Sequence, residues 1–399
     1  MEKNNKKISK LDKILIGITI KVLLIVLALA FVIPVLKNST TAEANSTLLS
    51  SNYTSAGSMA VMEVSTGRLL NSKNMHEKRA PASTTKILTA ICVIENIDDL
   101  DKLYKIPDAC VGVEGSSIYL EKGEELSIRD LLYGLMLQSG NDAAESLAII
   151  TSGSKEEFAT LMNATAVRIG ATNSNFVTAH GLDAKDHYTT AHDLALISCY
   201  ALRNKDFAEI VKTKQHETTW VGRDYKRKIN NKNKLLNSYD GADGVKTGFT
   251  RKAGRTFVAS STRDGMQVVC AVLNCGPMFE DSARLMTEAH NTYKMQPLTA
   301  IGQKMTTIKV ENGKNDSVAL GADREVFYPL TDNEVSCLTP KFNVPVSVKA
   351  PLKVGSKVGE FEINLKNELI YTVDLVTIEE ADSKNIVDRL KDIADRIAD

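Results

Sequence analysis

The order in which strand and helix patterns follow one another restricts the fold of this 399-residue chain more than any other feature. Two short strand patterns surround a Ser-Thr-Gly turn in residues 58–74, and strand patterns return at 244–275. Helical periodicity dominates between them, from 81 to about 211, and a further helical pattern covers 281–295. Strands at both ends of a helical stretch are typical of one shared sheet. We therefore predict an α/β (α+β) fold, an antiparallel sheet flanked by helices.

From about residue 300 the pattern changes to apolar and polar residues that alternate around Gly, Asn and Pro turns. We therefore expect two domains, the first over residues 58–298 and a small all-β, β-sandwich-like domain over 303–380. Residues 383–399 predict an amphipathic helix, and its apolar face is formed by Ile386, Leu390, Ile393 and Ile397.

The first 44 residues have the composition of an export segment. Residues 1–13 contain five lysines and two acidic residues, residues 22–36 are uninterrupted apolar, and Ala42-Glu43-Ala44 has the small-x-small pattern of a cleavage site. The positive flank keeps the N-terminus in the cytoplasm, so we expect the rest of the chain at the outer face of the cytoplasmic membrane. Small polar residues over 45–57 predict a linker.

Two fates remain open for this segment. It is cleaved after Ala44 as a signal peptide, or it stays as an N-terminal membrane anchor. Counted from Ile14, the apolar stretch has 23 residues, which is enough to span a bilayer if Lys21 snorkels. The C-terminal helix carries four basic and four acidic residues and no aromatic one, so we expect it to bind the membrane surface weakly or to dock on the β domain.

Charge and cysteine content argue against several classes of protein. Lysine plus arginine and aspartate plus glutamate both number 49, which gives no support to a nucleic-acid partner. The six cysteines are too sparse for a disulfide framework, and they show neither C-x-x-C nor Cys/His metal spacing. We expect mostly free, buried thiols and no metal or organic cofactor. Cys270 and Cys275 form the one local pair to test as a disulfide.

The stretch APASTTKILTA, residues 80–90, places Ser83 one helical turn before Lys86. One interpretation is that Ser83 caps a helix with an apolar face. The other is that Lys86, which lies over Ser83 at i, i+3, removes the proton of its hydroxyl. The stretch alone does not decide between the two.

Two downstream motifs favour the catalytic interpretation. Ser139-Gly140-Asn141 stands at the start of a helical pattern, and Lys246-Thr247-Gly248 stands on a strand that leads into a hairpin. In the order S-x-x-K, S-x-N, K-T-G, the three motifs form the set used by penicillin-binding proteins and serine β-lactamases. Chance assembly of all three in an exported chain is rare, so we predict a serine acyl-transfer site.

Each motif residue has a role that the chemistry requires. Lys86 is the general base for the Ser83 nucleophile, provided that burial and the charge of Lys246 keep its amine partly neutral. Ser139 relays a proton to the leaving amine, and Asn141 aligns the substrate amide and Lys86. Backbone and side chains of the third motif receive the substrate, and two backbone N–H groups hold the oxyanion. The substrate-binding residues are Lys246, Thr247, Gly248 and Phe249, and the oxyanion donors are the N–H groups of Ser83 and Phe249.

Three longer segments resemble the D-alanyl-D-alanine carboxypeptidases, the low-molecular-weight penicillin-binding proteins of peptidase family S11. They are NSNFVTAHGLDAKDHYTTAHDLALI (173–197), NKNKLLNSYDGADGVKTGFTRKAGRTFVASS (231–261) and VPVSVKAPLKVGSKVGEFEI (344–363). The resemblance covers roughly residues 58–380 and implies a penicillin-binding/serine β-lactamase-like fold. It also implies that the enzyme removes the terminal D-alanine from peptidoglycan stem peptides ending in D-Ala-D-Ala, and that β-lactam antibiotics inhibit it.

Some positions depart from that family or receive a structural interpretation. Several members carry an arginine shortly before the last helix of the catalytic domain, thought to grip the substrate carboxylate, and Met278 aligns with it. Either the K-T-G motif suffices there, or Arg284 or Arg255 replaces that arginine. His180 in TAHGL has no aspartate spacing for a triad, so we expect it to form structural hydrogen bonds. The basic run at 223–234 is interpreted as a solvated hairpin.

Three other functions remain as alternatives. A class A β-lactamase activates water with a glutamate in an E-x-x-L-N loop, but Glu156 and Glu157 have the wrong spacing and lie in a helical pattern. A non-catalytic cell-wall scaffold has little support, because every motif residue is intact. A D,D-transpeptidase stays open, since water and an amine attack the same acyl-enzyme.

Overall fold

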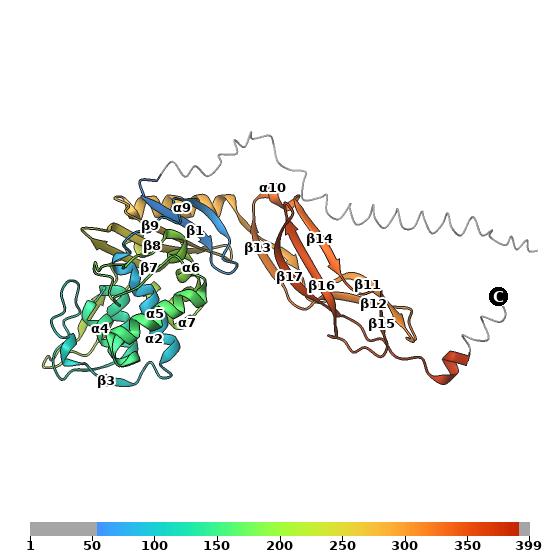
Figure 1. The fold of residues 1–399 in the computed structure, drawn as a ribbon, viewed down its shortest axis with the longest axis horizontal. Helices are drawn as coiled ribbons and strands as arrows, with labels where there is room; N and C mark the ends of the chain where they lie inside the picture. The colour runs from blue at the N-terminus through green and yellow to red at the C-terminus, as the bar shows by residue number, and fades with distance from the viewer. Residues whose placement is uncertain (1–53, 391–399) are drawn as a thin grey trace, which may run out of the picture. The chain divides into compact units, whose positions relative to one another are not determined.

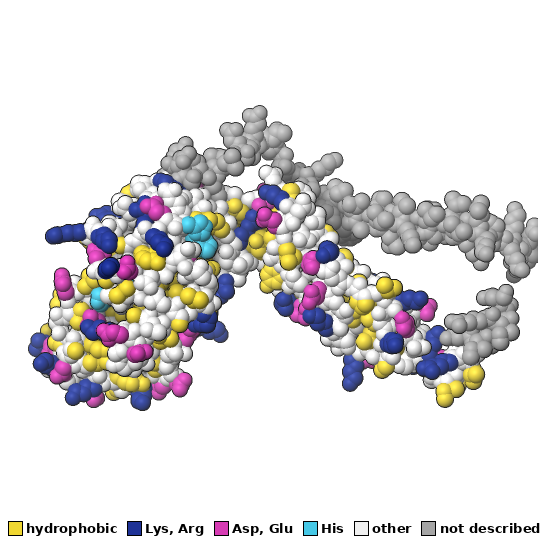
Figure 2. Space-filling model, in the orientation of Figure 1, with side chains coloured by type: hydrophobic (Ala, Val, Ile, Leu, Met, Phe, Trp, Pro, Cys, Tyr) yellow, Lys and Arg dark blue, Asp and Glu magenta, His cyan; other side chains and the backbone are white. Residues whose placement is uncertain are grey.

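The computed structural model describes residues 54–390 (Figure 1). The expected export segment, most of the linker and the end of the C-terminal helix lie outside the described residues. Within residues 54–390, no helix is both long and apolar enough to cross a membrane. On the face shown in Figure 2, basic and acidic side chains are interspersed among apolar ones, in keeping with the balanced composition.

A five-stranded sheet forms the centre of the first region, with the strand order β2-β1-β9-β8-β7. Every pair of neighbours is antiparallel, and β1 pairs with β9 although the two strands come from opposite ends of this region, with Ser58 facing Leu273. The predicted antiparallel sheet is confirmed. Its strands are β1 (Ser58–Glu63), β2 (Leu69–Lys73), β7 (Ala242–Thr250), β8 (Gly254–Arg263) and β9 (Met266–Leu273).

Helices cover both faces of this sheet, because alternate strand residues point to opposite sides. On one face, Met62 and Val258 belong to a large apolar cluster with residues of α2 to α7. On the other face, Met59 and Phe257 pack with α9. Figure 1 shows α9 on one side of the strands and α2, α4 and α5 on the other. The helices are α2 (Lys86–Asn96), α3 (Ile128–Tyr133), α4 (Asn141–Ser152), α5 (Lys155–Ile169), α6 (Ala191–Leu202), α7 (Lys205–Lys212) and α9 (Met278–Thr292).

Shorter elements shape the loops around the sheet. Within the helical stretch predicted from 81 to about 211, the π-helix η5 (Gly134–Gln138) follows α3, and the chain then turns at Ser139, whose left-handed φ is 68°. A left-handed φ is uncommon outside glycine and ends the helix before α4 begins. The remaining elements are η3 (Ala82–Thr85), β3 (Leu103–Lys105), η4 (Asp108–Cys110), β4 (Glu125–Ser127), β5 (Gln215–Thr218), β6 (Arg227–Asn230) and α8 (Leu235–Ser238).

The six cysteines follow the expectation from composition. All are free, and every one except Cys337 is buried. Burial raises the pKa of the Cys92, Cys199 and Cys270 thiols to about 12, which keeps them protonated and unreactive near neutral pH. Cys270 and Cys275 form no disulfide and pack as small apolar side chains.

Residues 294–383 form a region built of strands, as predicted, with α10 as a short helix within it. Its main sheet has the strand order β14-β16-β17-β12-β11-β15, and β10 pairs with β13. Apolar residues such as Val318 and Leu320 form its small core. Of the expected C-terminal helix, residues 386–390 are helical, and the rest lies outside the described residues. The elements are β10 (Lys294–Thr299), β11 (Lys304–Glu311), β12 (Ser317–Ala322), β13 (Val326–Leu330), α10 (Asp332–Val335), β14 (Leu338–Asn343), β15 (Ser347–Lys349), β16 (Lys357–Leu365) and β17 (Glu368–Thr377).

Candidate active site

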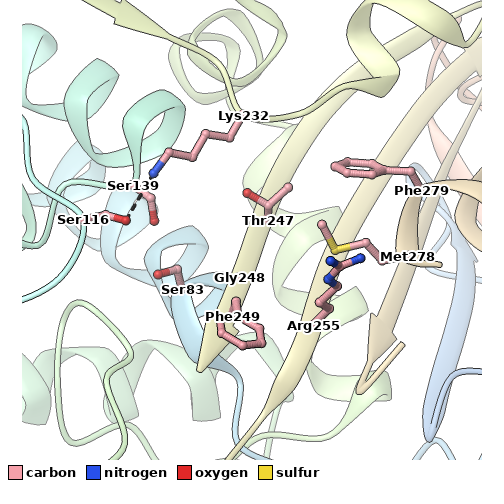
Figure 3. Close-up of a pocket in the computed structure, with 10 residues that line it drawn as sticks. All are labelled: Ser83, Ser116, Ser139, Lys232, Thr247, Gly248, Phe249, Arg255, Met278 and Phe279. Carbon is pink, nitrogen blue, oxygen red and sulfur yellow. Dashed lines mark hydrogen bonds between the residues drawn. The ribbon is translucent and has the colours of Figure 1, made fainter. Parts of the chain in front are cut away.

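The three sequence motifs meet at one pocket of about 340 Å³, beside the edge strand β7 (Figure 3). The motifs come from η3 and the start of α2, from the turn before α4, and from β7. Lys86, Asn141 and Lys246 are buried directly behind the pocket wall or within it. The motif residues and neighbours that line the pocket are Ser83, Ser139, Thr247, Gly248 and Phe249.

Ser83 lies in η3, the turn that leads into α2, and lines the pocket (Figure 3). The N-cap of this turn is Pro81 and that of α2 is Thr85, and neither position makes a side-chain cap hydrogen bond. The capping interpretation of Ser83 is therefore wrong. Its hydroxyl faces the pocket, where a nucleophile is required.

Lys86 is fully buried, and its Nζ is surrounded by three oxygens. Nζ lies 3.1 Å from Ser83 Oγ, 2.8 Å from Asn141 Oδ1 and 2.6 Å from the carbonyl oxygen of His180. The amide and carbonyl oxygens can only accept, so they take the two N–H groups of a neutral amine. In the neutral amine the lone pair is then left for the hydrogen of the Ser83 hydroxyl, whereas the charged amine donates to Ser83 Oγ. This is the arrangement of a general base and its nucleophile.

Asn141 is held so that its oxygen faces Lys86. Its Nδ2 donates to the carbonyl of Glu114 at 2.6 Å, which fixes the orientation of the amide. Its backbone N–H donates to the carbonyl of Ser116 at 2.7 Å. Gly115 has a left-handed φ of 93°, and a Cβ there would lie 2.7 Å from Nδ2. The loop before α4 therefore needs glycine at this position to receive the amide.

Burial and neighbouring charge favour the neutral form of Lys86. Burial is the main cause that lowers its pKa well below the ordinary lysine value; the charges of Lys246 and Lys232 lower the pKa further, and Asp142 opposes them. The pKa of Lys246 is lowered to about 7, mainly by burial and also by Lys232. Because only a neutral amine accepts a proton, the site favours the form of Lys86 that a general base needs.

The strand β7 brings its backbone close to Ser83. A Cβ at Gly248 would lie 2.4 Å from Thr256 Oγ1 and 2.9 Å from the backbone N of Ser83, so the strand approaches this closely only with glycine. Lys246 is buried and its Nζ donates to the carbonyl of Thr247 at 3.0 Å. Phe249 is 63% exposed and lines the pocket.

Two neutral histidines hold the segment that carries the His180 carbonyl. His180 Nδ1 accepts from the N–H of Leu182 at 3.0 Å, and His187 Nδ1 accepts from the N–H of Val177 at 2.9 Å. His187 Nε2 lies 3.0 Å from Thr85 Oγ1 and is the ring nitrogen left to donate. Burial is the main cause that lowers the pKa of both rings to about 4. His180 thus forms structural hydrogen bonds, as expected from its sequence context.

The structure distinguishes the two arginines that the sequence left open. Arg255 lines the pocket beside Met278, and its Nη1 donates to the carbonyl of Gly276 at 3.1 Å (Figure 3). Arg284 forms ion pairs with two carboxylates of its own helix, α9, at 3.3 Å each. A cation is therefore present at the pocket on β8, although position 278 holds a methionine.

Three pocket residues were not expected from the sequence, Ser116, Lys232 and Phe279. Lys232 belongs to the basic run interpreted as a solvated hairpin, but it lines the pocket, and its Nζ donates to Ser116 Oγ at 3.1 Å (Figure 3). None of these residues belongs to the three short motifs. The position of Lys232 between two asparagines, in NNKNK, is the one local signal that this lysine is held in a fixed loop.

An antiparallel sheet covered by helices, with a serine beside a buried lysine at its edge, is the arrangement of a serine acyl-transfer enzyme. The family described as D-alanyl-D-alanine carboxypeptidase matches residues 41–276, and the C-terminal domain of penicillin-binding protein 5 matches residues 293–383. The chain belongs to the D-alanyl-D-alanine carboxypeptidase family, the serine peptidases of family S11.

Individual relatives agree with this assignment over most of their length. The D-alanyl-D-alanine carboxypeptidase DacC of Escherichia coli is 32% identical over 83% of this chain and 86% of its own length. DacF of Bacillus subtilis is 29% identical over 79% of this chain and 83% of its own length. The crystal structure of DacD from Francisella tularensis matches 87% of this chain and 97% of that chain, with a TM-score of 0.64 and 27% identity. Both regions of the fold, mixed α/β and all-β, are therefore shared with this family.

Proposed function

We propose that this chain removes the C-terminal D-alanine from peptidoglycan stem peptides that end in D-Ala-D-Ala, through an acyl-enzyme on Ser83. The observation that carries this proposal is the environment of the Lys86 amine. Its two acceptors, the Asn141 amide oxygen and the His180 carbonyl, leave the lone pair for the Ser83 hydroxyl. Membership of the D-alanyl-D-alanine carboxypeptidase family supports the substrate class.

In the first half-reaction, Ser83 Oγ attacks the carbonyl of the penultimate D-alanine, and Lys86 accepts the hydroxyl proton. The backbone N–H groups of Ser83 and Phe249 hold the oxyanion, which the close approach of Gly248 to Ser83 supports. Ser139 relays this proton from Lys86 to the leaving amine, so Lys86 is neutral again before the second half-reaction. The C–N bond breaks, D-alanine departs, and an ester on Ser83 remains.

In the second half-reaction, water attacks the ester while Lys86 accepts a proton from it. The proton returns to Ser83 Oγ as the C–O bond breaks, and the shortened peptide leaves. Asn141 aligns Lys86 and the acyl amide during both steps. A β-lactam acylates Ser83 in the same way, but its amine stays tethered to the acyl group and blocks the attack of water.

The substrate carboxylate is proposed to lie at the β7–β8 side of the pocket. Lys246 and Thr247 present a cation and a hydroxyl there, and Arg255 adds a guanidinium. Arg255 takes this role rather than Arg284, because Arg284 is engaged by two carboxylates of α9. Met278 completes the wall as an apolar contact for the D-alanine methyl group.

We also propose a domain organisation and a membrane attachment for the chain. The catalytic domain spans 58–298, and the β domain at 303–380 follows it. The enzyme acts at the outer face of the cytoplasmic membrane, and the N-terminal segment, if it is not removed after residue 44, provides most of the attachment. Fractionation of a chain that lacks residues 1–44 and carries a foreign cleavable signal tests this: it should leave the membrane fraction, whereas tight pelleting would make the C-terminal helix the anchor.

The reaction itself is tested by mass spectrometry of a stem pentapeptide incubated with the full chain. The mass should fall by one alanine, and Ser83→Ala should abolish this loss and penicillin labelling while the thermal unfolding curve is kept. An unchanged peptide mass with Ser83 still labelled by penicillin would contradict the proposal. Rapid penicillin turnover would identify a β-lactamase, no label a scaffold, and peptide transfer to an added amine a transpeptidase.

A further inference from the structure

Lys232 stands at the mouth of the pocket in a loop that is tied down on both sides. Its backbone N–H donates to the carbonyl of Leu137 at 3.2 Å, in the π-helix of the helical wall. Asn233, which is buried, donates from Nδ2 to the carbonyl of Gly244 at 2.8 Å, on β7. Asn231 donates to two carbonyls at the end of α7, at 3.2 and 2.9 Å. The position of Lys232 is therefore fixed by backbone contacts with both walls of the pocket.

The amine of Lys232 is directed across the pocket towards a neutral partner. It donates to Ser116 Oγ at 3.1 Å, and Figure 3 shows the side chain extended towards Ser116 and Ser139. Two cations of the preceding strand behave differently. Arg227 Nη1 lies 2.8 Å from Glu124 Oε1, and Lys228 Nζ lies 3.5 Å from Glu217 Oε1. Both cations are therefore paired with carboxylates.

A third lysine at this pocket adds positive charge near two buried amines, so it disfavours the charged form of each. Like charges that share a pocket repel, and two of these amines are fully buried. The charged groups that act on the pKa of Lys86 are Lys246 from β7, Lys232 from the β6–α8 loop and Asp142 from α4, and the neutral His180 supplies the carbonyl 2.6 Å from its amine. Asp142 is saturated by hydrogen bonds from the 117–120 loop and offsets only part of the positive charge.

We infer that Lys232 is a positioning residue for proton transfer: its charge, held at the pocket mouth, keeps the Lys86 amine in the neutral form that accepts the Ser83 proton. The inference rests on the proposed function, because it assigns Lys86 as the base. The direction of the effect agrees with it, since the charge of Lys232 lowers the pKa of both Lys86 and Lys246.

The substitution Lys232→Gln isolates the charge, because glutamine keeps a hydrogen-bond donor for Ser116. Without the charge, the pKa of Lys86 rises, so the amine becomes neutral only at higher pH. The pH range in which the acylation rate rises (the rising limb) should move to higher pH by about half a unit. This is the order expected of one unit charge across a solvent-filled pocket. Below the limb the variant should be about threefold slower, and above it the rate should equal that of the wild type.

The measurement is the second-order rate of Ser83 acylation by a chromogenic cephalosporin, with the full chain, as a function of pH. Lys232→Arg keeps the charge and should keep the wild-type limb. Lys228→Gln removes a lysine from the same hairpin, exposed and paired with Glu217, and should not move the limb. The shift in Lys232→Gln should shrink in high salt, because salt screens a charge at the pocket mouth.

Each result decides a different claim. Failure of penicillin to label the wild type would overturn the proposed function and this inference with it. A labelled wild type with the Lys232→Gln limb unmoved would overturn the inference alone. So would a rate lowered by one factor at every pH, because that pattern belongs to a residue that contacts substrate.

Discussion

The two regions of the described chain treat charge in different ways. Before residue 300, whole charged side chains are buried, among them Lys86, Asp142, Asp193 and Lys246. Between residues 300 and 390 no charged side chain is buried, and Thr377 is the one buried polar residue there. Burying a charge is costly unless it is hydrogen-bonded or neutralised. The first region therefore tolerates a cost that the all-β region avoids.

Buried carboxylates and buried lysines of the first region are compensated differently. Asp142 accepts from the Ser117 hydroxyl and from the backbone N–H groups of Ile118 and Leu120, and these hydrogen bonds fix a loop. Lys86 and Lys246 bond instead to neutral oxygens, and burial lowers the pKa of both. The carboxylate of Asp142 holds a loop, whereas burial favours the neutral form of the two lysines, and the proposed chemistry uses the neutral form of Lys86.

The largest expected effect is that of Lys86→Ala. Both half-reactions lose their base, so turnover and β-lactam acylation should fall by about 10²–10⁴-fold, and by more where Ser83 and Lys86 act as a unit. Stopped-flow acylation by a chromogenic β-lactam measures this. Lys341→Ala is the matched change in the all-β region, where the lysine is exposed and pairs with Glu362 at 2.9 Å, and it should leave acylation unchanged.

Near wild-type acylation by Lys86→Ala would show that another group is the base. The pH dependence gives a second check on the wild type. Because the pKa of Lys86 is lowered, the acylation rate should rise with pH well below the ordinary lysine value of about 10.4. If the rate instead rose only near that ordinary value, the pKa of Lys86 would not differ from that of the exposed lysines.

Two glycines with the same backbone conformation sharpen the comparison. Gly181 has φ 84° and Gly355 in the all-β region has φ 83°. A Cβ at Gly181 would lie 1.9 Å from the carbonyl oxygen of Ala82, whereas nothing lies within 4 Å of a Cβ at Gly355. Gly355→Ala should therefore cost about 1–2 kcal/mol, the strain of a left-handed alanine alone.

Gly181→Ala carries the same strain plus a backbone collision next to Ser83. The segment must move, and with it the His180 carbonyl that holds Lys86 at 2.6 Å. We expect a loss of stability larger than that of Gly355→Ala and an acylation rate at least tenfold lower, because a small misplacement of a catalytic group is expensive. Thermal unfolding and acylation of both variants measure this. Equal losses of stability, with acylation intact, would contradict the packing argument.

The sequence predicted what residue types and spacing encode. Strand and helix periodicity gave the sheet and its flanking helices, and the three motifs gave the residues that meet at the pocket. The positions of Lys232 and of the His180 carbonyl were not predicted, because both are set by hydrogen bonds between distant segments. Such contacts depend on loop geometry, and the asparagines beside Lys232 are their one local signal in the sequence. The start of α4 directly after Ser139-Gly140 agrees with the prediction that this motif stands at the start of a helix, whereas the π-helix before it was not predicted.

The smallest expected effect is a loss of stability at acidic pH, and it should differ between the two regions. All six histidines precede residue 300. Burial lowers the pKa of His180 and His187 to about 4, from an ordinary value near 6.5. A lowered histidine pKa means that the unfolded chain binds the proton more readily. The stability from these rings is present above pH 6.5 and is lost as the pH falls from there to about 4.

The contribution of each of these two rings to the free energy of unfolding should therefore fall by at most about 2 kcal/mol between pH 7 and pH 5. His187 shows the physical cause. Its Nδ1 accepts a hydrogen bond from the backbone N–H of Val177 at 2.9 Å, and a protonated Nδ1 would place a second N–H against that donor. Hydrogen exchange, corrected for the intrinsic effect of pH, should show faster opening in peptides around 177–187 and no change in peptides beyond 303. His187→Asn replaces the acceptor Nδ1 by an amide oxygen that does not titrate, so the variant should start less stable but lose less on acidification. Equal acid sensitivity of the two regions, or of the variant and the wild type, would show that the buried histidines do not set this difference.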